Sequence, residues 1–257
     1  MLRYQKFNIA FALALTGLLV IDIFTDVPLL TYSGIILAFI GLMVWGSADI
    51  SSGWYCETLC SGNMEKRSIA LTFDDGPDKS ITPALLDLLR EEEIRAAFFC
   101  IGKKAEENPE LIQQIDRDGH IVGGHSYSHH YFFDLLSTGK MLAEMQRSED
   151  AISSSINKKI KLFRPPYSVT NPPLARALAR KKYHVIGWSL RSKDTVIKDE
   201  EKLLERVKKM VKPGDIILFH DTQKHTVVIL KKFIKFAKEE GYSLERLDNH
   251  LGIKAYE

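Results

Sequence analysis

Two adjacent carboxylates and a pair of histidines are the side chains of this sequence whose types and spacing could do chemistry. Asp74 and Asp75 end the apolar run Ile69 to Phe73, and a Gly-Pro turn follows them directly. Adjacent carboxylates repel each other, and desolvation makes both ionised forms costly, so a bound cation would relieve the conflict. His125 and His129, four residues apart, follow a second apolar run. One aspartate and two histidines predict a catalytic type of metal site with one position open for water.

Three further segments follow in a recognisable order, and they decide against the ordinary alternative of a turn beside two solvated histidines. Arg164 to Tyr167 follows an apolar stretch, Trp188 to Asp194 follows a short strand pattern, and Asp215 to Asp221 is an apolar strand that carries His220. Together the five motifs resemble the polysaccharide deacetylase family with the NodB homology domain, carbohydrate esterase family 4. The resemblance covers about Met64 to Glu257.

The resemblance implies that a metal site hydrolyses N-acetyl groups on amino sugars. It assigns the metal to the second aspartate of the first motif, Asp75, together with His125 and His129. We expect the two histidines to share one face of a helix, since their spacing would let both rings reach one ion. We predict one divalent ion; zinc is the default for such ligands, although manganese, cobalt or nickel also suits oxygen and imidazole donors.

The remaining roles follow the family residue by residue. Asp74 is the expected general base, and Arg164 is expected to pair with it, the alternative being an ordinary salt bridge at the rim. The backbone N–H of Tyr167 is expected to stabilise the oxyanion together with the metal. His220 is the expected general acid, and Asp194 is expected to orient it and to favour its charged form.

The acetyl pocket is where this sequence departs from the family pattern. Leu218 lies two residues before His220, so it should face the same side of the strand and line that pocket. Family members commonly have tryptophan after the aspartate of the fourth motif, whereas this chain has Thr195, and Ser168 replaces a frequent glycine. Trp188 and Tyr167 are the candidates for filling the space that this tryptophan would occupy in the acetyl pocket. Neither change removes a ligand or an acid–base group, so we expect catalysis.

Short apolar strands alternate with amphipathic helices from Lys66 onward, which predicts an α/β architecture. Every candidate site residue lies at the end of a strand pattern, where barrels and doubly wound sheets alike carry their chemistry. The resemblance selects between them and implies a distorted (β/α) barrel of about seven units. The expected strands are 68–73, 95–101, 121–124, 160–163, 184–188, 215–219 and 243–246, and the expected helices are 82–89, 109–118, 138–156, 172–182, 200–211 and 226–240.

A hydrophobic region precedes this domain. Phe7 to Phe24 and Val27 to Gly46 each have the length that a helix needs to span a hydrocarbon layer, ~20 residues. We therefore predict that residues 1–46 form a membrane anchor of two transmembrane helices. A cleaved signal peptide is the alternative for the first run, but no clear small-residue cleavage site follows it. Residues 47–63 read as a polar linker, and residues 64–257 form the expected deacetylase domain.

Composition sets the remaining bounds. The 257 residues carry a net charge of only +2, so nothing indicates nucleic-acid binding, and no protein partner can be inferred. Three cysteines are too few for a disulfide scaffold. Arg3 and Lys6 favour a cytoplasmic start, from which two spans would return the chain to the cytoplasm, whereas the family resemblance implies work outside. We predict a membrane protein with its catalytic domain outside, although the sequence leaves the side open.

The predicted function is therefore metal-dependent removal of N-acetyl groups from a glycan of the chitin or peptidoglycan kind. Two alternatives stay open at this point. One is a deacylase of a lipid-linked amino sugar at the membrane face, which a cytoplasmic domain would favour. The other is a carbohydrate-binding relative without turnover, against which the complete set of acid, base and metal residues argues.

Overall fold

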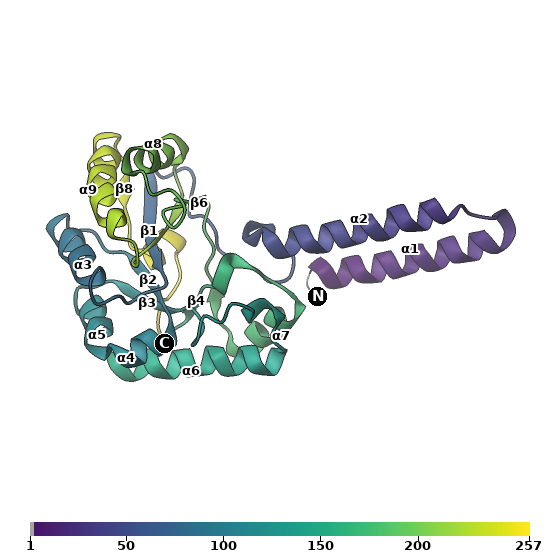
Figure 1. The fold of residues 1–257 in the computed structure, drawn as a ribbon, viewed down its shortest axis with the longest axis horizontal. Coiled ribbons are helices and arrows are strands. Elements are labelled where there is room, and N and C mark those ends of the chain that lie inside the picture. Colours follow the sequence, from purple (N-terminus) through teal and green to yellow (C-terminus); the bar gives the residue numbers. More distant parts are fainter. Residues whose placement is uncertain (1–2) are drawn as a thin grey trace.

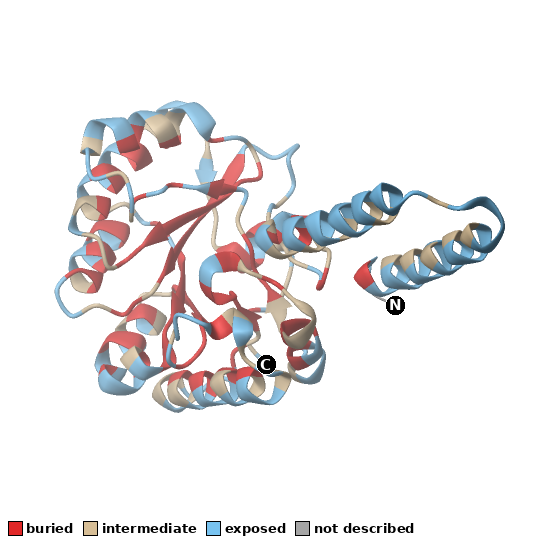
Figure 2. Ribbon diagram, turned by 45° about the vertical axis from the view of Figure 1, so that its right-hand side comes forward, coloured by how far each residue is buried: buried red, intermediate tan, exposed pale blue. Residues whose placement is uncertain are grey.

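Two long apolar helices and a curled parallel sheet make up the computed structural model of this chain, which describes residues 3–257 (Figure 1). The helices α1 (Arg3–Thr25) and α2 (Leu29–Ala48) form a hairpin that projects from the rest of the molecule. Both are long and apolar enough to cross a membrane, a test that a signal sequence also passes. Their side chains are largely exposed (Figure 2), as a lipid-facing hairpin requires.

The sheet is an open half-barrel whose strands run parallel, in the order β5-β4-β3-β2-β1-β7-β6, with β8 paired to β1. This confirms the expected distorted barrel of about seven units. Each expected strand overlaps an observed one, and β6 is the one observed strand, among residues 3–257, that was not predicted from the sequence. The strands are β1 (Ser68–Asp74), β2 (Ala97–Cys100), β3 (Ile121–Gly124), β4 (Leu162–Phe163), β5 (His184–Val185), β6 (Leu190–Arg191), β7 (Ile216–His220) and β8 (Ser243–Leu244).

Helices cover the outer face of this sheet, and most begin where a capping residue or proline predicts. The side chain of Asn171 accepts a hydrogen bond from Leu174 N–H, and Asp199 does the same for Lys202 N–H. The short helices α4 and α10 were not predicted from the sequence. The helices are α3 (Thr82–Glu91), α4 (Gly102–Glu107), α5 (Pro109–Arg117), α6 (Thr138–Ile156), α7 (Pro172–Lys181), α8 (Glu200–Met210), α9 (Lys224–Glu239) and α10 (Leu247–Leu251).

Aromatic side chains fill the core between the central strands and their helices. Phe73 of β1 stacks on Phe98 of β2 and on Phe219 of β7, with ring centroids 5.0 and 6.1 Å apart. All three side chains are at most 1% exposed, and Figure 2 shows the same burial along the whole central sheet. Because fully packed rings resist displacement, this core fixes the ends of β1 and β7, which carry the acidic pair and a histidine.

The segment 47–63 does not behave as the free linker that its polar composition suggested. It contains a short 3₁₀ helix (Ile50–Ser52), and Ile50 and Tyr55 are buried. Leu59 forms a parallel bridge to Ile186, which extends the sheet beyond β5. The segment is polar on average, but a few apolar residues spaced along it pack on the domain. The boundary at residue 64 stays a prediction, but the segment before it is part of the packed structure.

Both ends of the hairpin contact the domain. At the start of α1, the Arg3 guanidinium donates to the carbonyl of Ser52 at 2.9 Å, and the Tyr4 ring lies 5.2 Å from that of Tyr55. At the end of α2, the carbonyl of Ser47 accepts from Thr170 N–H at 3.1 Å. The hairpin is therefore attached at two points rather than tethered by one flexible strand.

Candidate active site

The carboxyl ends of β1, β3, β4 and β7 bring the predicted residues together. Asp74 is the last residue of β1 and lies opposite His220, the last residue of β7, in the sheet register. His125 directly follows β3, and Arg164 directly follows β4. Because all these strands are parallel, their ends meet at one edge of the sheet. Asp75, one residue further, has a positive φ of 74°, which turns its side chain back over this edge.

Asp75, His125 and His129 form one group of potential ligands, as predicted. Their donor atoms lie within 4.8 Å of one another. Oδ1 of Asp75 is 3.5 Å from Nε2 of His125 and 3.4 Å from Nε2 of His129. The two histidines do not lie on a helix, so that expectation was wrong. They flank a loop in which Ser126 and His129 have positive φ angles of 59° and 47°, and the loop brings the rings within 5.0 Å of each other.

The surroundings of His125 fit a metal ligand. Its Nδ1 lies 2.8 Å from the Arg164 carbonyl, which can only accept, so Nδ1 carries the proton. Nε2 is then left with a lone pair that faces the Asp75 carboxylate, an arrangement that needs a cation or a proton between them. Burial opposes a charge on His125, but Asp74 and Asp75 outweigh it and raise its pKa. A divalent ion would take the place of that proton.

The electrostatics of the other two ligands agree with this assignment. Burial disfavours the charge on Asp75, yet the hydrogen bond from His125 and the neighbouring histidines hold its pKa well below the usual range. Burial and the nearby His125 charge lower the pKa of His129. An ionised carboxylate and a neutral imidazole are the states that bind a metal ion.

Arg164 is the residue that binds this edge of the sheet together. It is fully buried, which excludes the rim salt bridge considered as its alternative. Its Nη1 donates to Oδ1 of Asp74 at 2.7 Å and to the Thr72 hydroxyl at 2.9 Å. Nε and Nη2 donate to the carbonyls of Ile186 and Gly187 at 3.2 and 2.7 Å. A buried guanidinium with this many partners keeps the Asp74 carboxylate in one position.

His220 and Asp194 form the pair that the fourth and fifth motifs predicted. Nδ1 of His220 lies 2.7 Å from Oδ1 of Asp194, and the His220 backbone N–H donates to Oδ2 at 2.8 Å. Thr226 and Ser192 also donate to this carboxylate. Burial opposes a charge on the imidazole, but the hydrogen bond to Asp194 outweighs it and raises the His220 pKa. Nε2 of His220 lies 4.0 Å from Oδ2 of Asp75, so it faces the group of potential metal ligands.

A cavity of about 190 Å³ opens above these residues. Tyr167 and Leu218 line it as predicted, and so does Thr195, at the position where the family often has tryptophan. Trp188 is not among the lining residues; its indole N–H donates to the Ser168 hydroxyl at 2.8 Å. Arg191 also borders the cavity. It was not predicted from the sequence, because β6, which carries it, was not recognised. The complete lining is Asp74, Asp75, His125, His129, Tyr167, Ser168, Arg191, Thr195, Leu218 and His220.

One more buried carboxylate near the site, Asp221, was not assigned a role from the sequence. It is almost fully buried, and one oxygen accepts from the Thr82 hydroxyl at 2.8 Å. Burial raises its pKa to about 7. A Cβ added at Gly76 would lie only 2.0 Å from an Asp221 oxygen. Glycine is therefore required after Asp75, because the Asp221 side chain occupies the space that any other residue would need.

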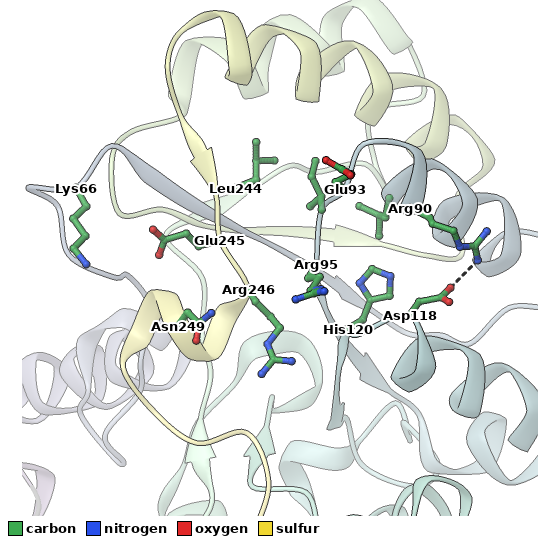
Figure 3. A pocket seen from close by; sticks show the side chains of 12 residues that line it. Lys66, Arg90, Glu93, Arg95, Asp118, His120, Leu244, Glu245, Arg246 and Asn249 are labelled. Carbon is green, nitrogen blue, oxygen red and sulfur yellow. Dashed lines mark hydrogen bonds and ion pairs between the residues drawn. The ribbon is translucent and has the colours of Figure 1, made fainter.

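A larger cavity, of about 680 Å³, lies at the opposite ends of the strands and does not share any of these residues. Its walls include Arg95 and His120, which precede β2 and β3. Figure 3 shows Arg90 paired with Asp118 there, at 2.8 Å. Nδ1 of His120 accepts from Ala96 N–H at 3.0 Å. Among residues 3–257, no group of potential metal ligands lies in this cavity, so cavity size does not identify the reactive site.

Comparison with known proteins agrees with the geometry. Residues 61–186 match the family described as "Polysaccharide deacetylase". A peptidoglycan-N-acetylglucosamine deacetylase of Bacillus cereus is 33% identical over 197 residues, which cover 75% of this chain and 91% of that protein. The crystal structure of the Bc1960 peptidoglycan N-acetylglucosamine deacetylase superposes with a TM-score of 0.73 at 27% identity, covering 77% and 94% of the two chains. The chitin deacetylase of the fungal pathogen Colletotrichum lindemuthianum gives 0.72 at 29% identity, covering 78% and 95%.

Proposed function

The chain belongs to the polysaccharide deacetylase family and is a hydrolase of N-acetyl amide bonds, and from this membership we propose that it deacetylates the amino sugars of a peptidoglycan-like glycan with one bound divalent metal ion. The observation that carries the proposal is the convergence of Asp74, Asp75, His125, His129 and His220 on one cavity. A non-catalytic relative would have no need for the complete set.

The metal site has the three protein donors of a catalytic centre. Asp75, His125 and His129 would hold the ion, and the Arg164 carbonyl fixes the ring of His125 through its second nitrogen. When bound, the ion would polarise the acetamide carbonyl and lower the pKa of a water molecule. We propose zinc, since two histidines and a carboxylate are a ligand set that catalytic zinc sites use, while manganese, cobalt and nickel are compatible with the same donors.

The protein's own acid and base lie on two sides of this centre. Asp74 accepts the proton of the attacking water, and Arg164 keeps its carboxylate oriented through the 2.7 Å hydrogen bond. His220 donates a proton to the nitrogen of the leaving amine as the carbon–nitrogen bond breaks, so that the products are acetate and the free amino sugar. Asp194 is a positioning residue that acts through His220. The backbone N–H of Tyr167 is proposed to donate to the developing oxyanion.

The substrate proposal rests on relatives and on the shape of the cavity. The similar proteins are named for peptidoglycan N-acetylglucosamine and for chitin, both polymers of N-acetylated amino sugars. A cavity of about 190 Å³ bounded by Leu218 and Thr195 suits a small acyl group. Nothing in the site favours a lipid-linked amino sugar over such a glycan, so we do not propose the lipid-linked substrate.

We also propose that α1 and α2 anchor the protein in a membrane. Both ends of the hairpin contact the domain, at Arg3 and at Ser47. The start of α1 and the catalytic domain would then lie on the same side of the membrane. We place that side outside the cytoplasm, where cell-wall glycan lies, although the positive charges of Arg3 and Lys6 favour the other orientation.

The direct test is acetate release from an N-acetylglucosamine oligomer by the full chain in detergent. We expect activity that is lost after dialysis against a chelator and is restored by adding back zinc or another divalent ion. Thermal unfolding followed in parallel separates metal loss from denaturation. Release of acetate at the same rate by the metal-free, folded chain would refute metal dependence, and no release with any of these metals would refute the deacetylase proposal.

The pH dependence should report the pair of His220 and Asp194. His220 must be protonated to act as an acid, so activity should fall as pH rises through its pKa, which Asp194 raises. In Asp194→Asn the raising effect is lost while burial remains, so the falling limb of kcat/KM should move to lower pH. Activity at the optimum should also decrease because the ring loses its orienting partner. A limb that stays in place, or moves to higher pH, would contradict the pairing.

A further inference from the structure

An exposed apolar surface lies beside the catalytic cavity; it includes Tyr167, whose backbone N–H the proposed mechanism uses, and four side chains that the mechanism does not use. It consists of Tyr131, Phe132, Leu135, Tyr167 and Val169, which we call the aromatic patch, and it borders a groove of about 360 Å³. Tyr131 and Leu135 are 75% and 74% exposed, and Phe132 is 53% exposed. Apolar side chains this exposed and this close together mark an interaction site, since scattered single ones are the rule on soluble surfaces.

The aromatic patch is fixed to the end of α2. Val169 is followed by Thr170, whose backbone N–H donates to the Ser47 carbonyl at 3.1 Å and whose hydroxyl donates to the Gly46 carbonyl at 3.2 Å. The Ser47 hydroxyl donates back to the Thr170 carbonyl at 2.5 Å. Asn171 extends the connection, because its side chain donates to the carbonyl of Asp134 at 2.5 Å, in the loop that carries Tyr131, Phe132 and Leu135.

The same end of α2 carries an aromatic residue suited to the edge of a bilayer. Trp45 is 49% exposed, lies next to Gly46, and packs on Trp54 with ring centroids 6.1 Å apart. Tryptophan and tyrosine concentrate at membrane–water interfaces, where the ring is in the apolar layer and the polar atom is in water. If Trp45 marks the interface, the hydrogen bonds to Thr170 hold the aromatic patch close to the same level.

We propose that the aromatic patch inserts into the interface of the membrane that α1 and α2 cross, so that the catalytic domain is docked on the lipid surface. This inference rests on the proposed membrane anchor. Phe132 and Leu135 would contribute apolar side chains to the lipid, and Tyr131 would keep its hydroxyl near the headgroups. The partner is the bilayer itself.

A sugar ring of the substrate is the competing occupant, because Tyr167 borders both the patch and the catalytic cavity. Sugar binding needs donors and acceptors for several hydroxyl groups. Apart from the two tyrosine hydroxyls, the only polar side chain that lines the groove, among residues 3–257, is Asp134. The purely apolar Leu135 and Val169 and the direct connection to α2 favour lipid.

Docking would determine which substrate the enzyme reaches. Tyr167 is shared by the patch and the cavity, so a patch in the lipid interface places the cavity mouth beside the bilayer. Amino sugars close to the membrane would then be accessible, while distant layers of a polymer would not. The anchor would therefore restrict the enzyme to amino sugars near the membrane as well as hold it there.

Depth-dependent fluorescence quenching tests the proposal on the full chain. Leu135→Cys is labelled with an environment-sensitive fluorophore in a Cys60→Ala background, since Cys56 and Cys100 are buried. The matched control is the variant Val228→Cys, which carries the same fluorophore. Val228 lies on α9 and is also an exposed apolar residue. In vesicles of phosphatidylcholine and phosphatidylglycerol, we expect lipid-borne quenchers to reduce the signal at position 135 and not at position 228. Equal quenching at both positions, or none at 135, would overturn the proposal.

A second measurement separates lipid from glycan. The triple variant Tyr131→Ser, Phe132→Ser, Leu135→Ser and the control Val228→Ser are assayed in detergent on a soluble N-acetylglucosamine oligomer. Lipid docking predicts the same KM for both, whereas a several-fold rise in KM for the triple variant alone would assign the patch to the substrate and overturn the proposal. Flotation with vesicles after alkaline extraction checks the anchor, and its failure also overturns the proposal. An inactive parent chain would refute the proposed function but would leave the quenching result intact.

Discussion

The full chain carrying both His125→Ala and His129→Ala should lose its divalent ion and all measurable deacetylase activity, while the parent chain retains one ion. The double substitution leaves Asp75 as the one remaining ligand of the group. A single carboxylate cannot hold a catalytic ion, because such sites use three protein donors. Elemental analysis of the purified protein and acetate release on the same sample measure the two losses.

His130→Ala is the matched control for this variant. His130 is the neighbour of His129 but is exposed, and its Nδ1 accepts from the backbone N–H of Phe132 at 3.0 Å. Full metal occupancy and activity are expected for it. Circular dichroism should show that all three proteins are folded. If the double variant retains one ion per chain, the ligand assignment is wrong, even if activity is lost.

Replacement of Asp74 by asparagine should separate catalysis from metal binding. Asparagine keeps the shape of the side chain and an oxygen that can accept from Arg164, but it cannot take the proton of the attacking water. General-base contributions amount to about 10²–10⁴-fold in rate, so we expect kcat/KM to fall within this range while metal content is unchanged. Initial rates of acetate release and elemental analysis test the two parts of the expectation.

Stability must be measured alongside, because Arg164 is fully buried and would lose its anionic partner Asp74. Breaking a buried ion pair on one side typically costs about 3–5 kcal/mol. The cost here should be at the lower end, since Thr72, Ile186 and Gly187 still accept hydrogen bonds from the guanidinium. A folded Asp74→Asn chain with the activity of the parent would show that Asp74 is not the base.

The arrangement of the site followed from the sequence wherever a strand determines it. Asp74 and His220 each end an apolar run, and the ends of parallel strands must meet at the same edge. Side-chain alternation along β7 likewise placed Leu218 on the same side as His220, and both line the cavity. In these positions a period of two residues and the topology leave little freedom.

Loops and short elements were the parts that the sequence did not determine. The spacing of His125 and His129 is typical of a helix, but positive φ angles at Ser126 and His129 produce the same proximity in a loop. Positive φ values in residues other than glycine depend on the packing around them, which no local pattern encodes. β6 is only Leu190–Arg191, too short for any periodicity, and with it the sequence analysis missed the contribution of Arg191 to the cavity.

The burial of Arg164 was also beyond reach from the sequence alone. The sequence predicted that Arg164 pairs with Asp74 but left a rim salt bridge open, since arginine is almost never fully buried unless it is paired. Its hydrogen-bond partners come from two separate segments of the chain, and its guanidinium lies 4.2 Å from the centre of the Phe99 ring in a third. Only the folded sheet brings these groups together around the Arg164 guanidinium.

Arg164 joins the proposed proton-accepting half of the site to the proposed metal-binding half. Its guanidinium binds Asp74, and its carbonyl accepts from the ring of His125. A displacement of this one residue would therefore change the position of the base and the orientation of a ligand together. The two halves form a single thermodynamic unit, in which free-energy changes at Asp74 and at His125 need not add.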